Sequence, residues 1–195
     1  MSAPRAPRAA TAKDDARHGI RLLDRKRAYR GRVITLLRDT IEINGRRLVR
    51  EIVEHPGSVV IVPVLPRKRI LFIRQYRRAL GATLLELPAG TLGAGEPRLR
   101  CAKRELEEET GHRARRWRRL GDFYPSPGFL SEFMTIFLAE DLAATAARPE
   151  ADELLEPVVL PLDVAIRKIH AGGIRDAKSI IGIWLASDRI KARRL

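Results

Sequence analysis

The sequence predicts a mixed fold of the α/β (α+β) class, in which helices pack on a mixed β-sheet. Three observations predict it. The run SVVIVPVL at 58–65 has the length and composition of a buried strand. The dipeptide Asn44–Gly45 lies between two alternating apolar and polar runs, a pattern typical of an antiparallel hairpin. Helix-like segments that end at glycine follow the strands, so both kinds of element are interleaved along the chain.

Residues 1–20 are rich in Pro, Ala and Arg, and we expect a disordered basic tail there. Alternation between Tyr29 and Glu54 predicts antiparallel strands, so we assign 21–57 to an N-terminal β-strand region. The rest of the chain, 58–195, is expected to form the main domain. Its expected strands are 58–65, 70–77 and 82–90, further strands and loops are expected at 115–127, 133–142 and 155–162, and its expected helices are 97–110, 162–173 and 177–194.

Composition restricts the class of protein. The 195 residues include one cysteine, Cys101, so no internal disulfide can form, and this fits a reducing cytoplasm. The longest apolar run is too short to cross a bilayer, and the N-terminus lacks the apolar core of a signal peptide. We therefore expect a cytoplasmic protein without a membrane partner.

The net charge of +14 has two interpretations. A basic excess can indicate binding to nucleic acid or to anionic lipid. It can also reflect an arginine-rich composition spread over solvated faces. Runs such as RARRWRR at 113–119 are short and lack the interleaved aromatic residues of a single-strand binding surface. We favour the compositional interpretation and keep nucleic-acid binding as the alternative.

Four glutamates crowd the helix that we expect between Pro97 and Gly111. At about 100° per residue, Glu105, Glu108 and Glu109 share one face, whereas Glu107 points about 200° away from Glu105. Clustered carboxylates are the hard oxygen ligands that Mg²⁺ and Mn²⁺ prefer. Taken alone, however, the run could equally be a solvated helix with Glu–Arg pairs.

The same helix needs an apolar contact to dock on the sheet. Leu99, Ala102 and Leu106 fall in a narrow stripe beside the acidic face. Arg104 lies within reach of Glu107 or Glu108 one turn later. We expect the helix to dock by its apolar stripe and to present the carboxylates along its flank.

Residues 90–112 follow the pattern G-x5-E-x7-R-E-U-x-E-E-x-G-U, where U is a bulky apolar residue, and this resembles the Nudix hydrolase box. Gly90, Glu96, Arg104 and Gly111 stand at fixed positions, and His112 departs from the apolar residue usual at the end. The resemblance implies a Nudix α/β/α sandwich with a mixed sheet. It also implies a site for Mg²⁺, with Mn²⁺ possible, and these ligands: Glu105, Glu108, Glu109 and the backbone carbonyl of Ala89. Arg104 is implied to orient a catalytic glutamate, and Glu96 to brace the loop.

Segments outside the box, among them IRQYR, LLELPAG and YPSPGFLSE, resemble the ADP-ribose pyrophosphatase branch of that superfamily. This implies Mg²⁺-dependent hydrolysis of ADP-ribose, or of a related nucleoside diphosphate sugar. The alternatives are a GDP-mannose-type sugar-nucleotide pyrophosphatase and a basic RNA-binding Nudix-like protein. The branch implies that Arg50 and Arg77 grip the substrate phosphates and that Glu86 lies near the site. Tyr29 could stack on adenine or simply anchor a strand.

In this branch the general base often comes from a mobile acidic loop, which here is RPEADELLEP. We choose Glu153, with Glu156 as the rival. The resemblance also implies a homodimer whose N-terminal strands, about 21–57, exchange between subunits, so that the partner could complete the active site.

Overall fold

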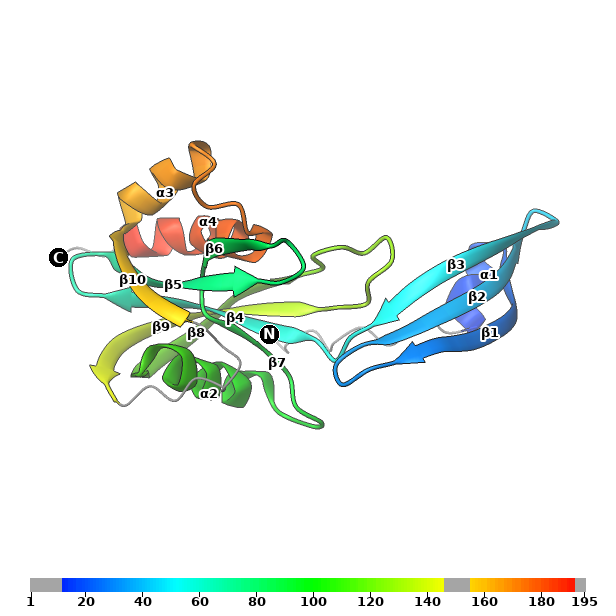
Figure 1. The fold of residues 1–195 in the computed structure, drawn as a ribbon, viewed down its shortest axis with the longest axis horizontal. Helices are drawn as coiled ribbons and strands as arrows, with labels where there is room; N and C mark the ends of the chain where they lie inside the picture. Colours follow the sequence, from blue (N-terminus) through cyan, green and yellow to red (C-terminus); the bar gives the residue numbers. More distant parts are fainter. Residues whose placement is uncertain (1–11, 146–154, 192–195) are drawn as a thin grey trace. The chain divides into compact units, whose positions relative to one another are not determined.

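The computed structural model describes residues 12–145 and 155–191, which pack into two compact units (Figure 1). Unit 1 contains the described part of 1–57 together with 124–133. Unit 2 contains 58–123 and the described part of 134–195. Each unit is described by itself below.

Unit 1 is a three-stranded antiparallel sheet in the order β1-β2-β3, formed by Ile20–Arg30, Thr35–Ile43 and Arg46–Glu54. Asn44 and Gly45 turn the chain between β2 and β3 with φ values of 50° and 72°. Two successive positive φ angles are what a two-residue type I′ turn requires, so the predicted hairpin is confirmed. Where we expected a tail up to residue 20, Ala12–Arg17 form the short helix α1 instead.

The loop 124–133 belongs to unit 1 because its backbone hydrogen bonds go to β3. Val53 N–H donates to the Phe129 carbonyl at 2.7 Å, and Ser131 N–H donates to the Val53 carbonyl at 2.9 Å. By its place in the sequence this loop was expected to belong to the main domain, 58–195. No pattern in the sequence indicates that it hydrogen-bonds to β3.

Unit 2 contains a seven-stranded sheet with the main order β10-β5-β4-β9-β8, to which β6 adds beside β5 and β7 beside β4. The β4–β9 pair is parallel and the other pairs are antiparallel, so the sheet is mixed as predicted. Its strands are β4 Ser58–Leu65, β5 Arg69–Arg77, β6 Ala82–Glu86, β7 Ala89–Thr91, β8 His112–Phe123, β9 Met134–Ala144 and β10 Leu155–Pro161, and its helices are α2 Arg98–Thr110, α3 Leu162–His170 and α4 Ala177–Lys191.

Helices cover both faces of this sheet (Figure 1). Val59 and Ile61 on β4 pack in the cluster that contains the buried residues of α2. Val60 and Val62 point to the opposite face and pack in the cluster that contains α3 and α4. A strand buried on both faces needs a continuous apolar run, which explains SVVIVPVL and makes unit 2 the predicted α/β/α sandwich.

The buried face of α2 differs from the expected apolar stripe. Ala102 and Leu106 are fully buried, but Leu99, in the first turn, is 39% exposed, and Cys101 is buried in the core instead. Pro97 is the N-cap, not the first helical residue. Gly111 ends the helix in the left-handed conformation with φ 64°, as predicted.

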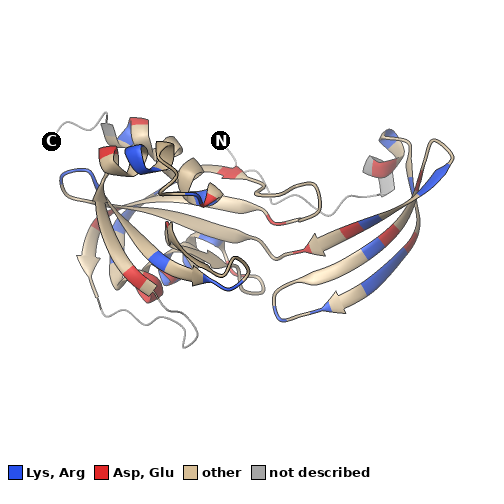
Figure 2. Ribbon diagram, turned by 45° about the horizontal axis from the view of Figure 1, so that its top comes forward, with Lys and Arg blue, Asp and Glu red and all other residues tan. Residues whose placement is uncertain are grey.

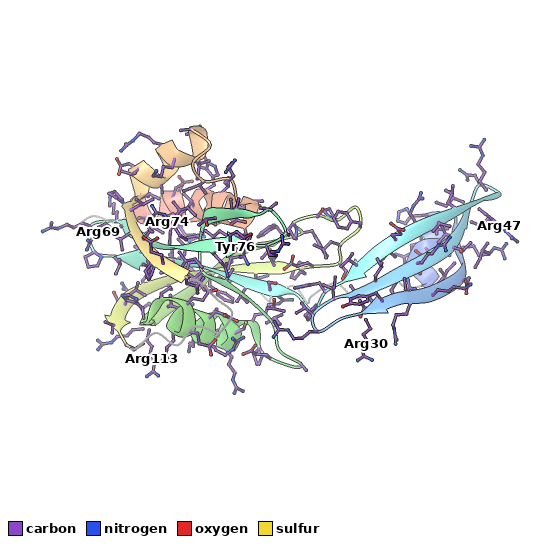
Figure 3. The ribbon with its side chains drawn as sticks, viewed as in Figure 1. Arg30, Arg47, Arg69, Arg74, Tyr76 and Arg113 are labelled. Carbon is purple, nitrogen blue, oxygen red and sulfur yellow. The ribbon has the colours of Figure 1, made fainter. Side chains whose placement is uncertain are left out.

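Positions of charged residues are spread along the elements of both units (Figure 2). Arg30, Arg47 and Arg113 project away from the elements that carry them (Figure 3). On β8, the arginines of the run 113–119 are paired in part: Arg113 with Glu107 at 2.6 Å and Arg116 with Asp141 at 2.6 Å. These ion pairs neutralise part of the basic run, which is consistent with the compositional interpretation of the net charge.

The two leucines of α2 give a test of how it docks. Leu106→Ala removes a fully buried side chain, and we expect it to lower the free energy of unfolding by about 2–5 kcal/mol. Leu99→Ala, the matched control on the same helix, should cost less than about 1 kcal/mol because its side chain is exposed. Urea unfolding measures both. Equal losses would mean that the helix docks by the stripe expected from the sequence.

Candidate active site

Two of the four glutamates of α2, Glu105 and Glu109, are buried against the sheet instead of lying along the flank of the helix. Glu105 is 9% exposed and Glu109 is 3% exposed, and both lie within the buried arc of the helix. Glu108 is half-buried at the margin of that arc. Glu107 is half-buried as well, but it pairs with Arg113 on β8 instead of Arg104, in keeping with its different helical angle. Burying a carboxylate costs free energy unless it is paired or hydrogen-bonded, so partners are required.

Arg104 supplies the countercharge for two of these carboxylates and for Glu96 in the preceding loop. Its Nη1 lies 2.7 Å from Glu105 Oε1 and donates to Glu108 Oε2 at 2.8 Å. Its Nε and Nη2 donate to the two oxygens of Glu96, each at 3.1 Å. The hydrogen bond to Glu96 raises the pKa of Arg104 above its ordinary value. Glu96 also accepts from Gly93 N–H at 3.0 Å, so it ties the loop before α2 to the helix.

Glycine at position 90 leaves the space beside it to the Glu105 side chain. A Cβ atom placed on Gly90 would lie 1.9 Å from Glu105 Cδ and Oε1, so any larger residue would force that carboxylate to move. The neighbouring Ala89 N–H donates to Glu109 Oε2 at 3.1 Å. The β7 backbone at 89–90 and the two buried glutamates are thus fitted to each other.

A second charged cluster surrounds Glu86, at the end of β6. Glu86 is 1% exposed and accepts from Arg77 Nε at 2.8 Å and from Arg77 Nη2 at 2.6 Å. Lys178 on α4 also donates to Glu86 and lies 3.0 Å from Asp176. Burial opposes the ionisation of Glu86, but its bonds to Arg77 and Lys178 hold its pKa below the ordinary value.

Sequence reasoning missed Lys178 and Asp176. A signal was present in the segment Asp176–Ala177–Lys178–Ser179, because Asp is a favoured N-cap residue whereas a lysine in the first helical turn opposes the helix dipole. In the structure Asp176 accepts a hydrogen bond from Ser179 N–H at 3.0 Å.

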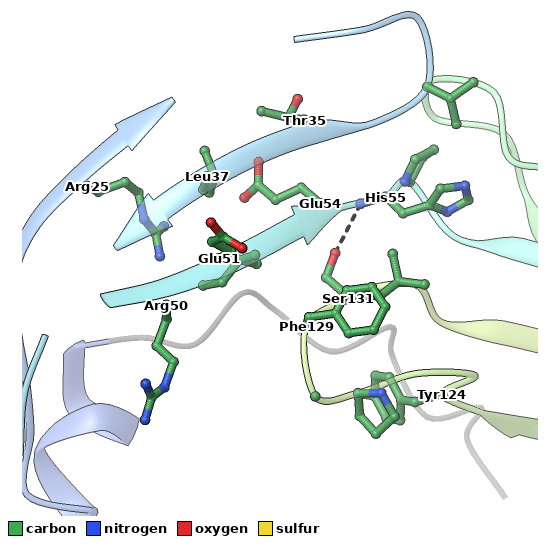
Figure 4. Close-up of a pocket in the computed structure, with 16 residues that line it drawn as sticks. Arg25, Thr35, Leu37, Arg50, Glu51, Glu54, His55, Tyr124, Phe129 and Ser131 are labelled. Atoms are coloured by element: carbon green, nitrogen blue, oxygen red, sulfur yellow. Dashed lines mark hydrogen bonds between the residues drawn. The ribbon is translucent and has the colours of Figure 1, made fainter. Parts of the chain in front are cut away.

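Arg50 and Tyr29 lie in unit 1, where loop 124–131 and the sheet enclose a hollow of about 830 Å³ (Figure 4). Arg50 and Glu51 of β3 line it, with Tyr124 and Phe129 from the loop. His55 N–H donates to Ser131 Oγ at 3.1 Å and ties the end of β3 to that loop. Tyr29 on β1 is not among the residues that line the hollow and is 58% exposed.

Of the two candidates for the general base, the structure describes only one. Glu153 lies outside the described residues. Glu156 is the second residue of β10, lies opposite Arg74 in the β5–β10 register and pairs with it at 3.1 Å.

No helix within 12–145 and 155–191 is both long and apolar enough to cross a membrane.

A sequence model of the NUDIX domain matches residues 54–180, which include the whole acidic helix and both charged clusters. The chain belongs to the Nudix family. It is 37% identical over 162 residues to an ADP-ribose pyrophosphatase of Bacillus subtilis, covering 82% of this chain and 88% of the relative. It is 33% identical over 134 residues to a GDP-mannose pyrophosphatase of Cronobacter sakazakii, covering 64% of this chain and 70% of the relative.

The Nudix fold is also found by structural comparison. A crystal structure described as an ADP compounds hydrolase superposes with a TM-score of 0.78 at 26% sequence identity, covering 88% of this chain and 94% of that chain. The α/β/α sandwich and the mixed sheet are therefore those of a Nudix hydrolase.

Nudix hydrolases generally need a divalent metal, and the donors on α2 suit one. Glu105, Glu108 and Glu109 offer hard carboxylate oxygens, and the space beside Gly90 is kept clear for one of them. Within the described part of the chain, no three acidic, histidine or cysteine side chains already converge as a metal site. Because Glu105 and Glu108 share Arg104 Nη1, binding of a cation competes with this ion pair.

The pairing of Glu96 with Arg104 predicts a pH dependence of stability. The hydrogen bond from Arg104 lowers the pKa of Glu96 from 4.5 to about 2. A lowered pKa in the folded state contributes stability above about pH 4.5 that is lost as the pH falls toward 2. Urea unfolding of Glu96→Gln should therefore show lower stability near neutral pH and a shallower decline between pH 4.5 and 2 than the wild type. Parallel pH profiles for the two proteins would contradict this.

Proposed function

We propose that this Nudix hydrolase cleaves the diphosphate of ADP-ribose, giving AMP and ribose 5-phosphate, with Mg²⁺ as its metal. The observation that carries the proposal is the pair of buried glutamates, Glu105 and Glu109, fitted against Ala89 and Gly90. The identity of the chain to an ADP-ribose pyrophosphatase over most of its length supports the substrate.

The residues are assigned as follows. Glu105, Glu108, Glu109 and the carbonyl of Ala89 would hold the metal. When bound, a divalent cation neutralises diphosphate charge and lowers the pKa of a bound water. Arg104 keeps the glutamates oriented through its contacts with Glu105 and Glu108. Glu153 is proposed to accept the proton of the attacking water, with Glu156 as the rival.

Arg77 is proposed to bind the diphosphate through its guanidinium group, which suits phosphate oxygens. The charge of Glu109 on the acidic helix also contributes to the raised pKa of Arg77, after the hydrogen bond to Glu86 and the charges of Glu86 and Asp176, and this supports the assignment. We assign Arg50 to substrate binding because it lines the hollow of unit 1, whose aromatic residues Tyr124 and Phe129 suit a nucleoside. Tyr29 remains a candidate for stacking on adenine.

GDP-mannose hydrolysis is the second candidate, supported by the similarity to a GDP-mannose pyrophosphatase. The chemistry at the diphosphate is the same in both cases, so the two candidates differ only in the groups that recognise base and sugar. Binding to RNA without hydrolysis is the third candidate, motivated by the net charge of +14.

A hydrolysis screen of ADP-ribose, GDP-mannose, dinucleoside polyphosphates and capped RNA, each with Mg²⁺ and with Mn²⁺, decides among them. We expect ADP-ribose to be the best substrate. Glu105→Gln and Glu109→Gln should each lower kcat/KM on the order of a hundredfold or more, and Glu107→Gln should change it less than about threefold. Circular dichroism confirms that each variant is folded. A folded Glu105→Gln variant with wild-type turnover would refute the metal site, and retention on RNA without any turnover would favour the binding protein.

We also propose that the chain is a homodimer joined through unit 1. Among the described residues, seven of the thirteen exposed large apolar side chains lie in this smaller unit, including Val33, Ile34 and Phe129. Exposed apolar groups at this density favour a protein partner.

Sedimentation equilibrium should give twice the 22.0 kDa of one chain. Val33→Asp should shift the protein toward monomer, whereas Leu80→Asp, at a 64% exposed site in unit 2, should not. A wild-type protein that sediments as a monomer would contradict the proposal.

A further inference from the structure

Lys178 occupies a position that is unfavourable for a cation. It lies in the first turn of α4, where the helix dipole repels positive charge. Its side chain is only 11% exposed, so little water solvates the ammonium group. A buried ammonium group requires specific partners to offset its desolvation.

Both partners are acidic. Lys178 Nζ donates to Glu86 Oε2 and lies 3.0 Å from Asp176 Oδ1. Glu86 Oε2 also accepts from Arg77 Nη2, so one carboxylate oxygen is shared by two cations that come from β5 and α4. Glu86 itself is 1% exposed, and the two cations therefore determine its orientation.

The first turn of α4 also contacts the backbone that leads to the acidic helix. Ser179 Oγ accepts a hydrogen bond from Leu87 N–H at 2.7 Å and donates to Asp176. Two residues later, Ala89 N–H donates to Glu109. The segment 86–90 is thus held at one end by α4 and at the other by α2.

We propose that Lys178 is a positioning residue that fixes Arg77 for the substrate diphosphate by holding Glu86 from the opposite side. The inference rests on the proposed function, in which Arg77 binds that diphosphate. Glu86 engages Nε and Nη2 of Arg77, which leaves the Nη1 edge of the guanidinium for phosphate oxygens. Without Lys178, Glu86 loses its second partner and can turn, and Arg77 turns with it.

Steady-state kinetics on ADP-ribose test this with three variants. Lys178→Met should raise KM on the order of tenfold while changing kcat less than about threefold, because substrate binding and not chemistry is impaired. Lys178→Arg, which keeps a cation for Glu86, should recover most of the loss. Lys168→Met, which removes an exposed lysine of α3, is the matched control and should match the wild type. An unchanged KM in Lys178→Met would overturn the proposal.

Repeating the Lys178 substitution in a Glu86→Gln background separates a positioning role from direct contact with the diphosphate. If Lys178 acts through Glu86, then Glu86→Gln/Lys178→Met should be no worse than Glu86→Gln alone. If Lys178 touched the diphosphate itself, the same fold-loss would be seen in both backgrounds, and the proposal would be wrong. Thermal unfolding verifies folding. Should Lys178→Met not fold, Lys178→Gln, which retains a donor for Glu86, takes its place.

A measurement that does not depend on hydrolysis tests the positioning role separately from the proposed function. The Nε–H signal of Arg77 in ¹H–¹⁵N NMR spectra, assigned with Arg77→Lys, should be protected from solvent exchange in the wild type. It should lose protection in folded Lys178→Met and keep it in Lys168→Met. If the wild type fails to hydrolyse ADP-ribose, the proposed function fails, but the NMR comparison still decides the positioning role. An unchanged Arg77 signal in Lys178→Met would overturn that role.

Discussion

The burial of Glu105 and Glu109 between α2 and β7 imposes requirements on the surrounding residues. Carboxylates in the contact between a helix and a sheet need countercharge and hydrogen-bond donors, because water no longer supplies them. Arg104 meets the first need for Glu105, and the backbone N–H of Ala89 donates to Glu109. While the Glu105 side chain lies there, a Cβ at position 90 would clash with it, so a larger residue would displace the carboxylate. The apolar residues Ala102 and Leu106 then supply the docking energy that the glutamates cannot.

The opposite layer repeats this arrangement on a smaller scale. Glu86 is buried where β6 ends, and its charge is offset by Arg77 from β5 and Lys178 from α4. The two charged clusters are joined by the short segment 86–90, which is hydrogen-bonded to both helices. Five residues of backbone thus connect α4 to the acidic helix, so residues outside the Nudix box help to hold the strand against which its glutamates pack.

Much of this could be predicted from the sequence, because local chemistry decided it. Asn44–Gly45 and Gly111 demand left-handed backbone, SVVIVPVL demands burial on both faces, and the spacing of the box positions its glutamates. What could not be predicted depends on contacts between distant segments. Helical periodicity gave the angle of Glu105 but not its burial, since an angle does not say which side faces the sheet. The partnership of Glu86 and Lys178 spans 92 residues, and no local pattern encodes such a distance. Leu99 has the right helical angle but lies in the first turn and stays exposed.

The two charged clusters are acidic although the whole chain is basic, and this explains why a metal is expected at the site. Six carboxylates belong to the two clusters, namely those of Glu86, Glu96, Glu105, Glu108, Glu109 and Asp176. They face three cations, Arg77, Arg104 and Lys178. The balance is acidic despite a net charge of +14 for the whole chain. Exposed arginines are screened by salt within about 10 Å and cannot correct this balance. An anionic diphosphate would therefore be repelled unless divalent cations enter with it, so the surplus of arginine elsewhere does not replace the metal.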